Sequence, residues 1–466
     1  MNAPAGTPRP GAGQPAGSGL AAAFVGVALG AILVPLNSTM LAVALPSLMA
    51  DFGVGPATVA SLVTLYLGAV TVAMPASGAI GDRLGHRRVF LAGVAAFALA
   101  SIVGALAPSF PVLVASRIGQ AVAGASISTN AAALVRAMAP ADRRGTSFGV
   151  FELLVSASAA AGPIVGGLLV AAFGWRSLFV VAAPVAAASA VVVAVVLPAA
   201  LSVARRGGRP LDLRGLGLLA AALVALVALM AGDLPPGAAA ATTVAGAAVA
   251  VLFVRHELGS AAPAVDVRLF ARRPFAAAVL AVLGATVVLH GTLVVVPLAV
   301  EGLLGGHAAE SGLALLGVSG LGALAAPLGG RLSDRSSRRL PAVVGALVMA
   351  AALLVLALVG PLSLTLLVGL LAVAGFGLGF SGPPRLVAAL ESVSPAQAGM
   401  AAGTYMTGRY LGGVLGATLA GTVLAAGVSR SSVALAFVLL AVVALAVAAA
   451  GAGLQGRRSA AVSGPD

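Results

Sequence analysis

The sequence predicts an all-α membrane protein that crosses the bilayer many times, with two six-helix bundles and two further helices inserted between them. The first reason is composition: 60% of the 466 residues are hydrophobic and 8% are charged, whereas a soluble domain carries about 25% charged residues. The second reason is that the apolar runs are long and continuous, unlike the alternating segments of about ten residues in a membrane β-barrel. The third reason is a polar motif that occurs twice, which indicates a duplicated architecture.

The net charge of +13 does not indicate a nucleic-acid partner. All 26 basic residues are arginines, and most stand in short gaps between apolar runs, as expected for charge that sets membrane topology. The sequence has no cysteine, and its four histidines form no ligand-spaced cluster, so it offers no metal site and no thiol nucleophile. It also lacks a phosphate-binding Walker loop. We therefore expect no enzyme activity, no cofactor and no ATP-driven pumping.

The chain begins with a tail, residues 1–19, that is rich in Gly, Pro, Ala and Ser and is expected to be disordered and cytoplasmic. It lacks the charged and apolar regions of a signal peptide. Each apolar run that follows is long enough to cross roughly 30 Å of hydrocarbon. These runs predict fourteen helices, near residues 20–45, 56–80, 88–107, 110–138, 144–172, 176–199, 214–232, 237–254, 275–300, 310–330, 340–360, 362–388, 398–426 and 431–454.

The arginines predict the orientation of these helices. With both termini cytoplasmic, only Arg176 and Arg430 lie outside, while Arg117, Arg385 and Arg409 lie within predicted helices. All other arginines then fall in cytoplasmic segments, as the positive-inside rule requires. An error of one helix would scramble this segregation, so it supports the helix count as well. We expect a multi-pass protein of the cell membrane.

The repeated polar motif divides the chain into two halves. Its first copy, residues 78–88 (GAIGDRLGHRR), follows the second predicted helix, and its second copy, residues 330–339 (GRLSDRSSRR), follows the tenth. We name these copies the first and second loop motifs. A plain six-plus-six duplication would place the second copy after the eighth helix, so two helices have been inserted. The predicted divisions are a tail at 1–19, a first bundle at 20–199, the inserted pair and a cytoplasmic linker at 200–274, a second bundle at 275–454, and a tail at 455–466.

The loop motifs are candidates for a conformational latch, meaning a set of contacts that biases a two-state equilibrium. A carboxylate beside arginines near a helix end gains from charge pairing and from a neighbouring helix N-terminus. Acids contribute little to topology, so Asp82 favours this interpretation, whereas each arginine alone could equally be a topology anchor. We expect the first motif to be the tighter latch, because Ser337 replaces the later glycine in the second. The latch candidates are Gly78, Asp82, Arg83, Gly85, Arg87, Arg88 and Arg136 in the first half, and Asp334, Arg335, Arg338 and Arg339 in the second.

Further segments complete a pattern that resembles the major facilitator superfamily, and within it the fourteen-helix drug:proton antiporters. The first loop motif has the superfamily's order of glycine, Asp-Arg pair, glycine and two basic residues. Residues 36–46 (LNSTMLAVALP) are similar to the first-helix signature, and Tyr66 fits the second helix. Residues 117–120 (RIGQ) resemble the arginine motif of the fourth helix, and residues 162–167 (GPIVGG) resemble the fifth-helix motif associated with antiport. The resemblance covers residues 20–454.

The resemblance implies a major facilitator fold and a proton-coupled secondary transporter that exports small, mostly apolar or amphipathic molecules by alternating access. Its partners would be a small-molecule substrate, protons and the lipid bilayer, and we expect a monomer. Asn37 stands where the family usually has an aspartate, which leaves a metabolite uniporter or proton symporter of the same fold open. A membrane sensor that does not transport is a third alternative, which the intact first loop motif disfavours.

Polar residues within the predicted helices are candidates for the pathway of substrate and protons. Arg117 lies roughly 10 Å deep, where a charge is costly and should face the bundle interior or a wet cavity. Asn37 could face it, while Tyr66 and Gln120 belong to segments that match the family. Alternatively, Arg117 is a structural residue satisfied by backbone carbonyls and Asn37.

Three ionisable residues complete the candidate pathway. Glu152 is the only carboxylate well inside a predicted helix, where burial disfavours the charged form and lets the group hold and release a proton. If its helix begins later, Glu152 only marks the membrane interface. His290, near the middle of the ninth helix, suits a proton relay but could equally be a neutral packing residue. Arg409 is an embedded charge in the second half with no assigned role.

The fifth-helix motif contains Gly162, Pro163, Gly166 and Gly167. Proline removes a backbone hydrogen bond and kinks a helix, and glycines allow close helix contact. A helix that bends and packs closely can seal one side of a bundle while the other side opens. Close packing without gating is the alternative.

Overall fold

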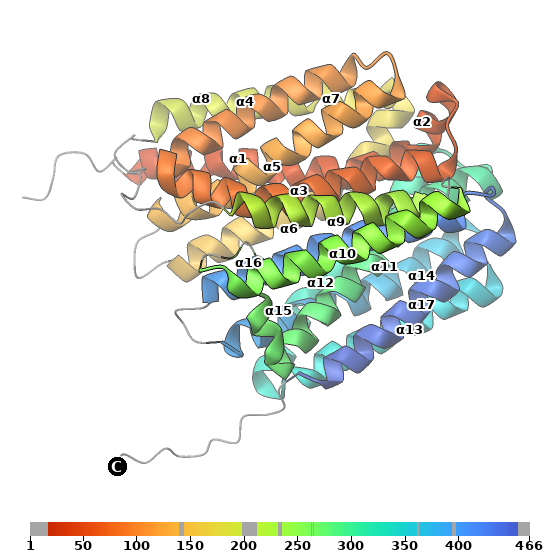
Figure 1. The fold of residues 1–466 in the computed structure, drawn as a ribbon. Coiled ribbons are helices and arrows are strands. Elements are labelled where there is room, and N and C mark those ends of the chain that lie inside the picture. The colour runs from red at the N-terminus through yellow and green to blue at the C-terminus, as the bar shows by residue number, and fades with distance from the viewer. Residues whose placement is uncertain are drawn as a thin grey trace, which may run out of the picture.

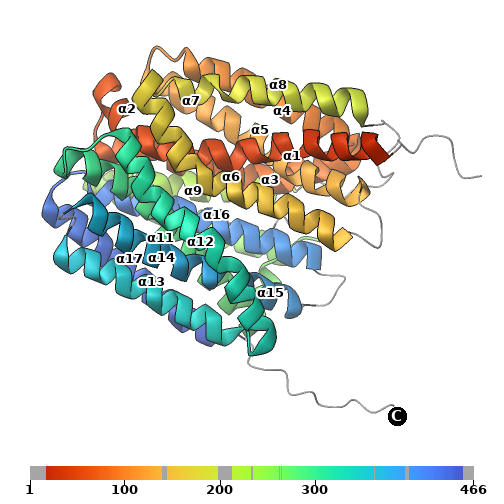
Figure 2. The same cartoon turned by 180° about the vertical axis from the view of Figure 1, so that it is seen from behind.

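The computed structural model describes residues 17–138, 144–197, 212–231, 235–261, 263, 265–360, 363–393 and 398–454, and every regular element within these ranges is a helix. The long helices run roughly side by side in one bundle (Figures 1 and 2). Within the described residues, eleven helical segments are long and apolar enough to cross a membrane. The predicted all-α, multi-pass membrane architecture is therefore confirmed.

The first half of the bundle consists of α1 (Gly17–Met40), η1 (Leu41–Ala44), α2 (Leu45–Phe52), α3 (Pro56–Leu84), α4 (His86–Ala105), α5 (Phe110–Met138), α6 (Arg144–Phe173), α7 (Ser177–Val180) and α8 (Ala182–Val196). Two glycines set the sharpest turns in this half. Gly53 ends α2 with a φ of 63°, and Gly85 joins α3 directly to α4 with a φ of 93°. Both values lie in the left-handed region that favours glycine. The chain therefore turns at Gly85, a glycine of the first loop motif.

The second half consists of α11 (Arg273–Leu303), α12 (Ala308–Arg335), α13 (Arg339–Val359), α14 (Leu364–Phe380), α15 (Gly382–Glu391), α16 (Ala398–Val423) and α17 (Arg430–Ala452). α14 and α15 form one membrane segment interrupted at Ser381, just before Pro383 and Pro384. The break follows from proline, which cannot donate the hydrogen bond that a continuous helix needs. It leaves α15 as a short helix directed across the end of α11 and α16.

Two helices separate the halves, α9 (Leu213–Ala231) and α10 (Pro236–Gly259), followed by the short η3 (Val267–Ala271). Asp212 fastens this hairpin, because its Oδ1 accepts hydrogen bonds from the Gly215 amide at 2.8 Å and from the His256 ring at 2.7 Å. α9 packs against both α3 and α16, whereas α10 packs on α9 and leaves its apolar stretch exposed. Two helices thus lie between the two halves along the chain, and α9 contacts both halves directly.

The two ends of the bundle have different cores. We call the end that carries the loop motifs the motif end and the opposite end the distal end. At the distal end one hydrophobic core contains residues of both halves, among them Leu62, Val63, Val294 and Leu424. At the motif end each half has its own core, one around Phe90 and the other chiefly around residues 269–282 and 388–405. The halves are thus joined at the distal end and separate towards the motif end.

Two seams join the halves at the distal end. In the first, α3 meets α16, and the buried hydroxyls of Thr64 and Thr418 lie 3.1 Å apart. In the second, α6 meets α12 so closely that a Cβ on Gly312 would lie 2.4 Å from the Pro163 carbonyl oxygen. Only glycine permits that approach without moving a backbone.

Candidate functional site

Arg117 of α5 is the centre of a buried polar cluster between α1, α3 and α5. Its side chain is 1% exposed and donates hydrogen bonds to the Asn37 side-chain oxygen and, at 2.8 Å, to Gln120 Oε1. The guanidinium lies over the Tyr66 ring, 4.2 Å from its centroid. Gln120 in turn donates to Ser101 Oγ at 2.8 Å. The structure thus brings together the four candidates taken from three separate sequence segments, and it adds Ser101 from α4.

The backbone explains why these side chains converge. Arg117 and Gln120 are three residues apart on α5, so both point from the same face of the helix. Tyr66 lies about 15 Å from the distal end of α3 and Arg117 about 10 Å from the distal end of α5, at about 1.5 Å per residue. The cluster therefore lies well inside the hydrocarbon depth of the bundle.

The charge of Arg117 is compensated by neutral groups. Amide oxygens and an aromatic face surround it, and no carboxylate contacts it within the described part of the chain. Its Nε atom and the Tyr66 hydroxyl are buried without a hydrogen-bond partner. Buried polar groups are normally satisfied, so atoms of this kind indicate a site for a water or a ligand. The alternative that Arg117 is a structural residue predicts hydrogen bonds to Asn37 and to backbone carbonyls. Arg117 does donate to Asn37, but no backbone carbonyl is among the described partners of Arg117.

A second cluster lies in the other half, at the motif-end side. Arg385 of α15 is 4% exposed and donates to Ser381 Oγ at 3.0 Å. Arg385 also forms a hydrogen bond with the buried Tyr405 of α16. Arg409 lies one turn further along α16, and its charge acts on both Arg385 and Tyr405. Arg409 itself is exposed although it lies in the middle of α16. Sequence reasoning did not assign Arg385 or Tyr405, but the spacing of Tyr405 and Arg409 on one helix face was a usable signal.

His290 of α11 lies beside Arg409. Its ring nitrogen Nδ1 is 3.1 Å from the Thr286 carbonyl oxygen, and a Cβ on Gly413 would lie 3.1 Å from the same ring atom. Thr286 in addition donates from its hydroxyl to the Arg409 carbonyl at 2.8 Å. The histidine therefore stands at the tight contact of α11 with α16, an environment compatible with both a packing residue and a proton relay.

The two clusters approach each other across the seam of α3 and α16. Tyr66 of the first cluster is within electrostatic range of Tyr410 of α16, and the Leu67 side chain packs against Gly413. Polar residues of both halves therefore meet near mid-depth. Glu152 lies on α6 and Arg136 on α5, but their side chains are outside the described residues.

The fifth-helix motif packs on two partners. On one side a Cβ on Gly162 would lie 3.0 Å from the Leu36 carbonyl, and one on Gly166 would lie 2.8 Å from the Met40 carbonyl. On the other side a Cβ on Gly167 would lie 2.6 Å from the Ala308 carbonyl oxygen of α12, next to the contact of Pro163 with Gly312. The motif therefore holds α6 to its own half and to the opposite half at once.

The first loop motif makes its described contacts within the first half. Asp82 pairs with His86 at 3.5 Å, and His86 is 2.8 Å from the Asn130 side-chain oxygen. Gly81 leaves room for these groups, because a Cβ there would meet both the Asn130 amide and the His86 ring. Arg87 donates to the Ala194 carbonyl of α8 at 2.7 Å. The motif thus ties α3, α4, α5 and α8 together.

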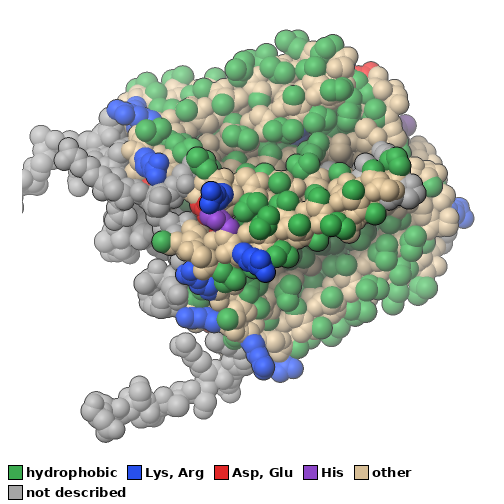
Figure 3. Space-filling view, viewed as in Figure 1, with side chains coloured by type: hydrophobic (Ala, Val, Ile, Leu, Met, Phe, Trp, Pro, Cys, Tyr) green, Lys and Arg blue, Asp and Glu red, His purple; other side chains and the backbone are tan. Residues whose placement is uncertain are grey.

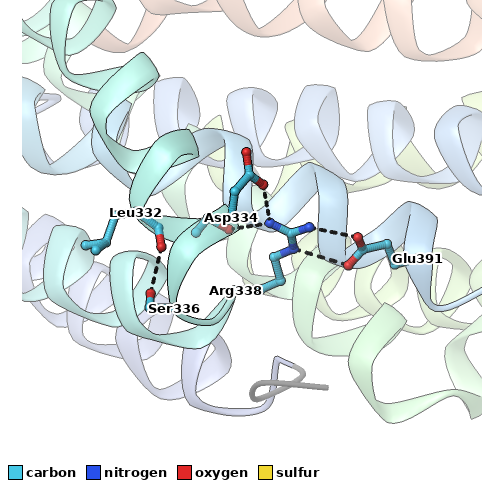
Figure 4. Close-up of polar contacts among 6 residues, drawn as sticks. Leu332, Asp334, Ser336, Arg338 and Glu391 are labelled. Atoms are coloured by element: carbon cyan, nitrogen blue, oxygen red, sulfur yellow. Dashed lines mark hydrogen bonds and ion pairs between the residues drawn. The ribbon is translucent and has the colours of Figure 1, made fainter. Parts of the chain in front are cut away.

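The second loop motif is more strongly paired (Figure 4). Arg338 donates to both carboxylate oxygens of Glu391 at 2.8 and 3.2 Å, to Asp334 at 2.7 Å and to Ser333 at 3.0 Å. The hydrogen bonds that Arg338 donates to Glu391 are the largest influence, and they raise the pKa of Arg338 above its usual value. This pairing includes Glu391 at the end of α15, a second carboxylate that the motif's own sequence does not contain. Which of the two motifs is the tighter latch stays a prediction.

Two helical halves that share a core at one end, with arginines buried inside the membrane depth, are the features of a membrane transport protein. The sequence model of the Major Facilitator Superfamily matches residues 27–417 and 274–464. The chain belongs to this superfamily. The predicted superfamily and the general function of a transporter are thereby confirmed.

Several characterised and uncharacterised transporters are similar in sequence. The uncharacterized MFS-type transporter YvkA of Bacillus subtilis (strain 168) is 32% identical over 395 residues, which are 84% of this chain and 88% of the relative. The tetracenomycin C resistance and export protein of Streptomyces glaucescens is 33% identical over 334 residues, 71% of this chain and 62% of the relative. The multidrug resistance protein Stp of Mycobacterium tuberculosis (strain CDC 1551 / Oshkosh) is 30% identical over 398 residues, 84% and 73% of the two chains.

The fold is also similar to that of a solved transporter. A POT family transporter, crystallised in complex with 5-aminolevulinic acid, matches with a TM-score of 0.70 over 93% of this chain and 95% of its own. The sequence identity is 17%, so this likeness concerns the fold alone.

Proposed function

We propose that the chain is a proton-coupled exporter of small, mostly apolar or amphipathic molecules, in the fourteen-helix drug:proton antiporter branch of the superfamily. The observation that carries the proposal is the Arg117 cluster, which is buried at the level where the two halves meet and keeps polar atoms without partners. The names of two relatives, one an export protein and one a multidrug resistance protein, support the export of small molecules.

The proposed topology has fourteen transmembrane helices. It adds α6, α9 and α16, which lie in the same bundle, to the eleven apolar segments. On the face seen in Figure 3, arginine side chains gather mainly at the motif end, which supports cytoplasmic termini and a cytoplasmic motif end. We keep the divisions at 20–199, 200–274 and 275–454, and we expect a monomer in the cell membrane.

With this orientation, the joined distal end faces outward and the separate motif-end cores face the cytoplasm. The structure then corresponds to a state that accepts substrate from the cytoplasm, as an exporter requires. In the opposite state the motif end must close, and we propose that Asp82 then takes part in the latch, with Arg136 of the same half as a partner. The fifth-helix motif would act as the gate at the distal end, because it contacts both halves there.

Glu152 is the first candidate for the proton carrier, and His290 is the second. Purified protein in proteoliposomes that are preloaded with a fluorescent apolar compound should expel the compound in exchange for protons when an inwardly directed proton gradient is applied. Glu152→Gln, which cannot ionise, is expected to abolish gradient-driven transport and leave compound binding largely intact. Transport that survives unchanged in this variant would remove Glu152 as the carrier, and His290→Gln is then the matched test.

Two alternative functions make different predictions in the same assay. A uniporter or proton symporter would move the compound without counter-transport of protons, or in the same direction as protons. The Asn37 side chain supports this alternative, because it occupies the Arg117 cluster as a group that cannot ionise. A sensor would bind the compound and produce no flux in either direction.

A further inference from the structure

Arg117, Arg385 and Arg409 lie within predicted membrane helices, and their surroundings differ. Arg117 and Arg385 are enclosed, with 1% and 4% of their surfaces exposed, whereas Arg409 is exposed. No carboxylate of the described residues pairs with any of the three. The only acid expected at comparable depth is Glu152, whose side chain is outside the described residues.

Arg409 is exposed deep within its helix. It lies about 17 Å from the motif end of α16, at about 1.5 Å per residue, and therefore near the middle of the membrane. An exposed guanidinium at this depth requires water or a counter-charge.

Arg409 has a second cation nearby. The charges of Arg385 and Arg409 repel each other, and Tyr405 interacts with both guanidinium groups. The Arg385 Nε atom is buried without a hydrogen-bond partner, so this cluster too has an unused donor. Two like charges in a medium of low dielectric repel each other, and an anion bound beside them relieves the repulsion.

We propose that Arg409, supported by Arg385 and Tyr405, binds the anionic group of an amphipathic organic anion, such as a carboxylate or phenolate with an apolar body. The proposal rests on the proposed transport function and names the substrate class. A guanidinium matches a carboxylate with two parallel hydrogen bonds, which gives both affinity and orientation. A cationic compound of the same shape is disfavoured by the same charges.

Three probes of one shape test the proposal, namely pyrenebutyrate, its neutral methyl ester and a pyrenebutyl trimethylammonium ion. Binding to the full-length protein in detergent is measured by equilibrium dialysis, and transport is measured in proteoliposomes. The wild-type protein is expected to bind the anion at least about tenfold more tightly than the ester or the cation. Tighter binding of the ester or the cation would overturn the proposal without any variant.

The variants separate a specific site from a general loss of structure. Arg409→Gln should weaken binding of pyrenebutyrate about 10- to 100-fold and change binding of the ester less than about twofold. Arg409→Lys keeps the charge and should retain part of the preference, while Arg430→Gln, which removes an exposed cation at the distal end, should change nothing. Equal weakening of all three probes by Arg409→Gln contradicts the proposal. If that variant does not fold, the wild-type series decides.

Transport separates this inference from the function on which it rests. Movement of the cation but not of the anion would overturn the anion site and leave an exporter in place. Arg409-dependent binding of pyrenebutyrate without flux of any probe would support the anion site and overturn the transport proposal.

Discussion

The distal end and the motif end of this bundle hold together by different means. At the distal end the halves share one hydrophobic core and meet through glycines, where the backbone of one half approaches the backbone of the other. At the motif end the described ion pairs stay within each half, as in Asp82 with His86 and Arg338 with Glu391. A packed, dry contact is sensitive to a single added carbon atom, whereas exposed ion pairs exchange readily with water. We infer that the distal seams set the geometry of the transport cycle and that the loop motifs shift the equilibrium between its two states.

The largest effect is expected from a covalent lock across the first seam. The Thr64 and Thr418 hydroxyls are 3.1 Å apart, and the chain has no cysteine of its own. In the double variant Thr64→Cys with Thr418→Cys, oxidation should join α3 to α16 and abolish transport, because the distal end can then no longer open. Reductant should restore transport, and each single variant serves as a control. A fully cross-linked protein that transports at the original rate would show that this seam does not move.

A bulky residue in the second seam should have the next largest effect. Gly312→Leu places a side chain against the Pro163 carbonyl, where a Cβ alone would lie 2.4 Å away. Overpacking of this kind costs about 1–3 kcal/mol. The population of the state in which the distal end is closed should therefore fall about tenfold or more. The measurement is initial transport rate together with accessibility of a cysteine label near Gly167. Gly237→Leu in α10 is the matched control, because a Cβ on Gly237 meets no atom within 4 Å.

The first loop motif should show a smaller effect on rate. Asp82→Asn removes the carboxylate that we assign to the latch, and we expect a fall in turnover of a few fold with normal expression. The equivalent substitution Asp334→Asn in the second motif is the internal comparison. Turnover at the wild-type level in Asp82→Asn would leave no role for the carboxylate in the cycle.

The smallest effect is expected for Glu391→Gln. Glu391 is Arg338's main partner, but its side chain is 39% exposed, so the pair is screened by water. We expect a loss of thermal stability corresponding to about 1 kcal/mol or less, read from the midpoint of unfolding, and little change in transport. A large loss of transport would instead mean that the second motif is the stronger switch.

Much of the fold could be predicted from the sequence, because each membrane helix corresponds to a long run of apolar residues. The superfamily and the all-helical architecture were predicted correctly, and α3 and α16 differ from their expected bounds by only a few residues. The convergence of Asn37, Tyr66, Arg117 and Gln120 was partly predictable too, because a charge in a membrane helix must face polar partners.

Other features depend on contacts between segments far apart in the chain. Glu391 reaches the second loop motif through the packing of α15 against α12, and it lies 53 residues from Arg338 along the chain. Arg385 and Tyr405 lie in different helices, so neither helix alone indicates the cluster around Arg409.

The position of α9 makes the two flanks of the bundle unequal. Its leucines at 216, 219 and 223 are turned inward, and the helix lies along α3 and α16, the helices of the first seam. The second seam, of α6 with α12, carries no inserted helix. An apolar molecule dissolved in the lipid leaflet therefore meets a barrier on one flank and a bare helix boundary on the other. We therefore expect lateral entry from the bilayer to take place on the α6–α12 flank, so that the two flanks would differ in function as well as in packing.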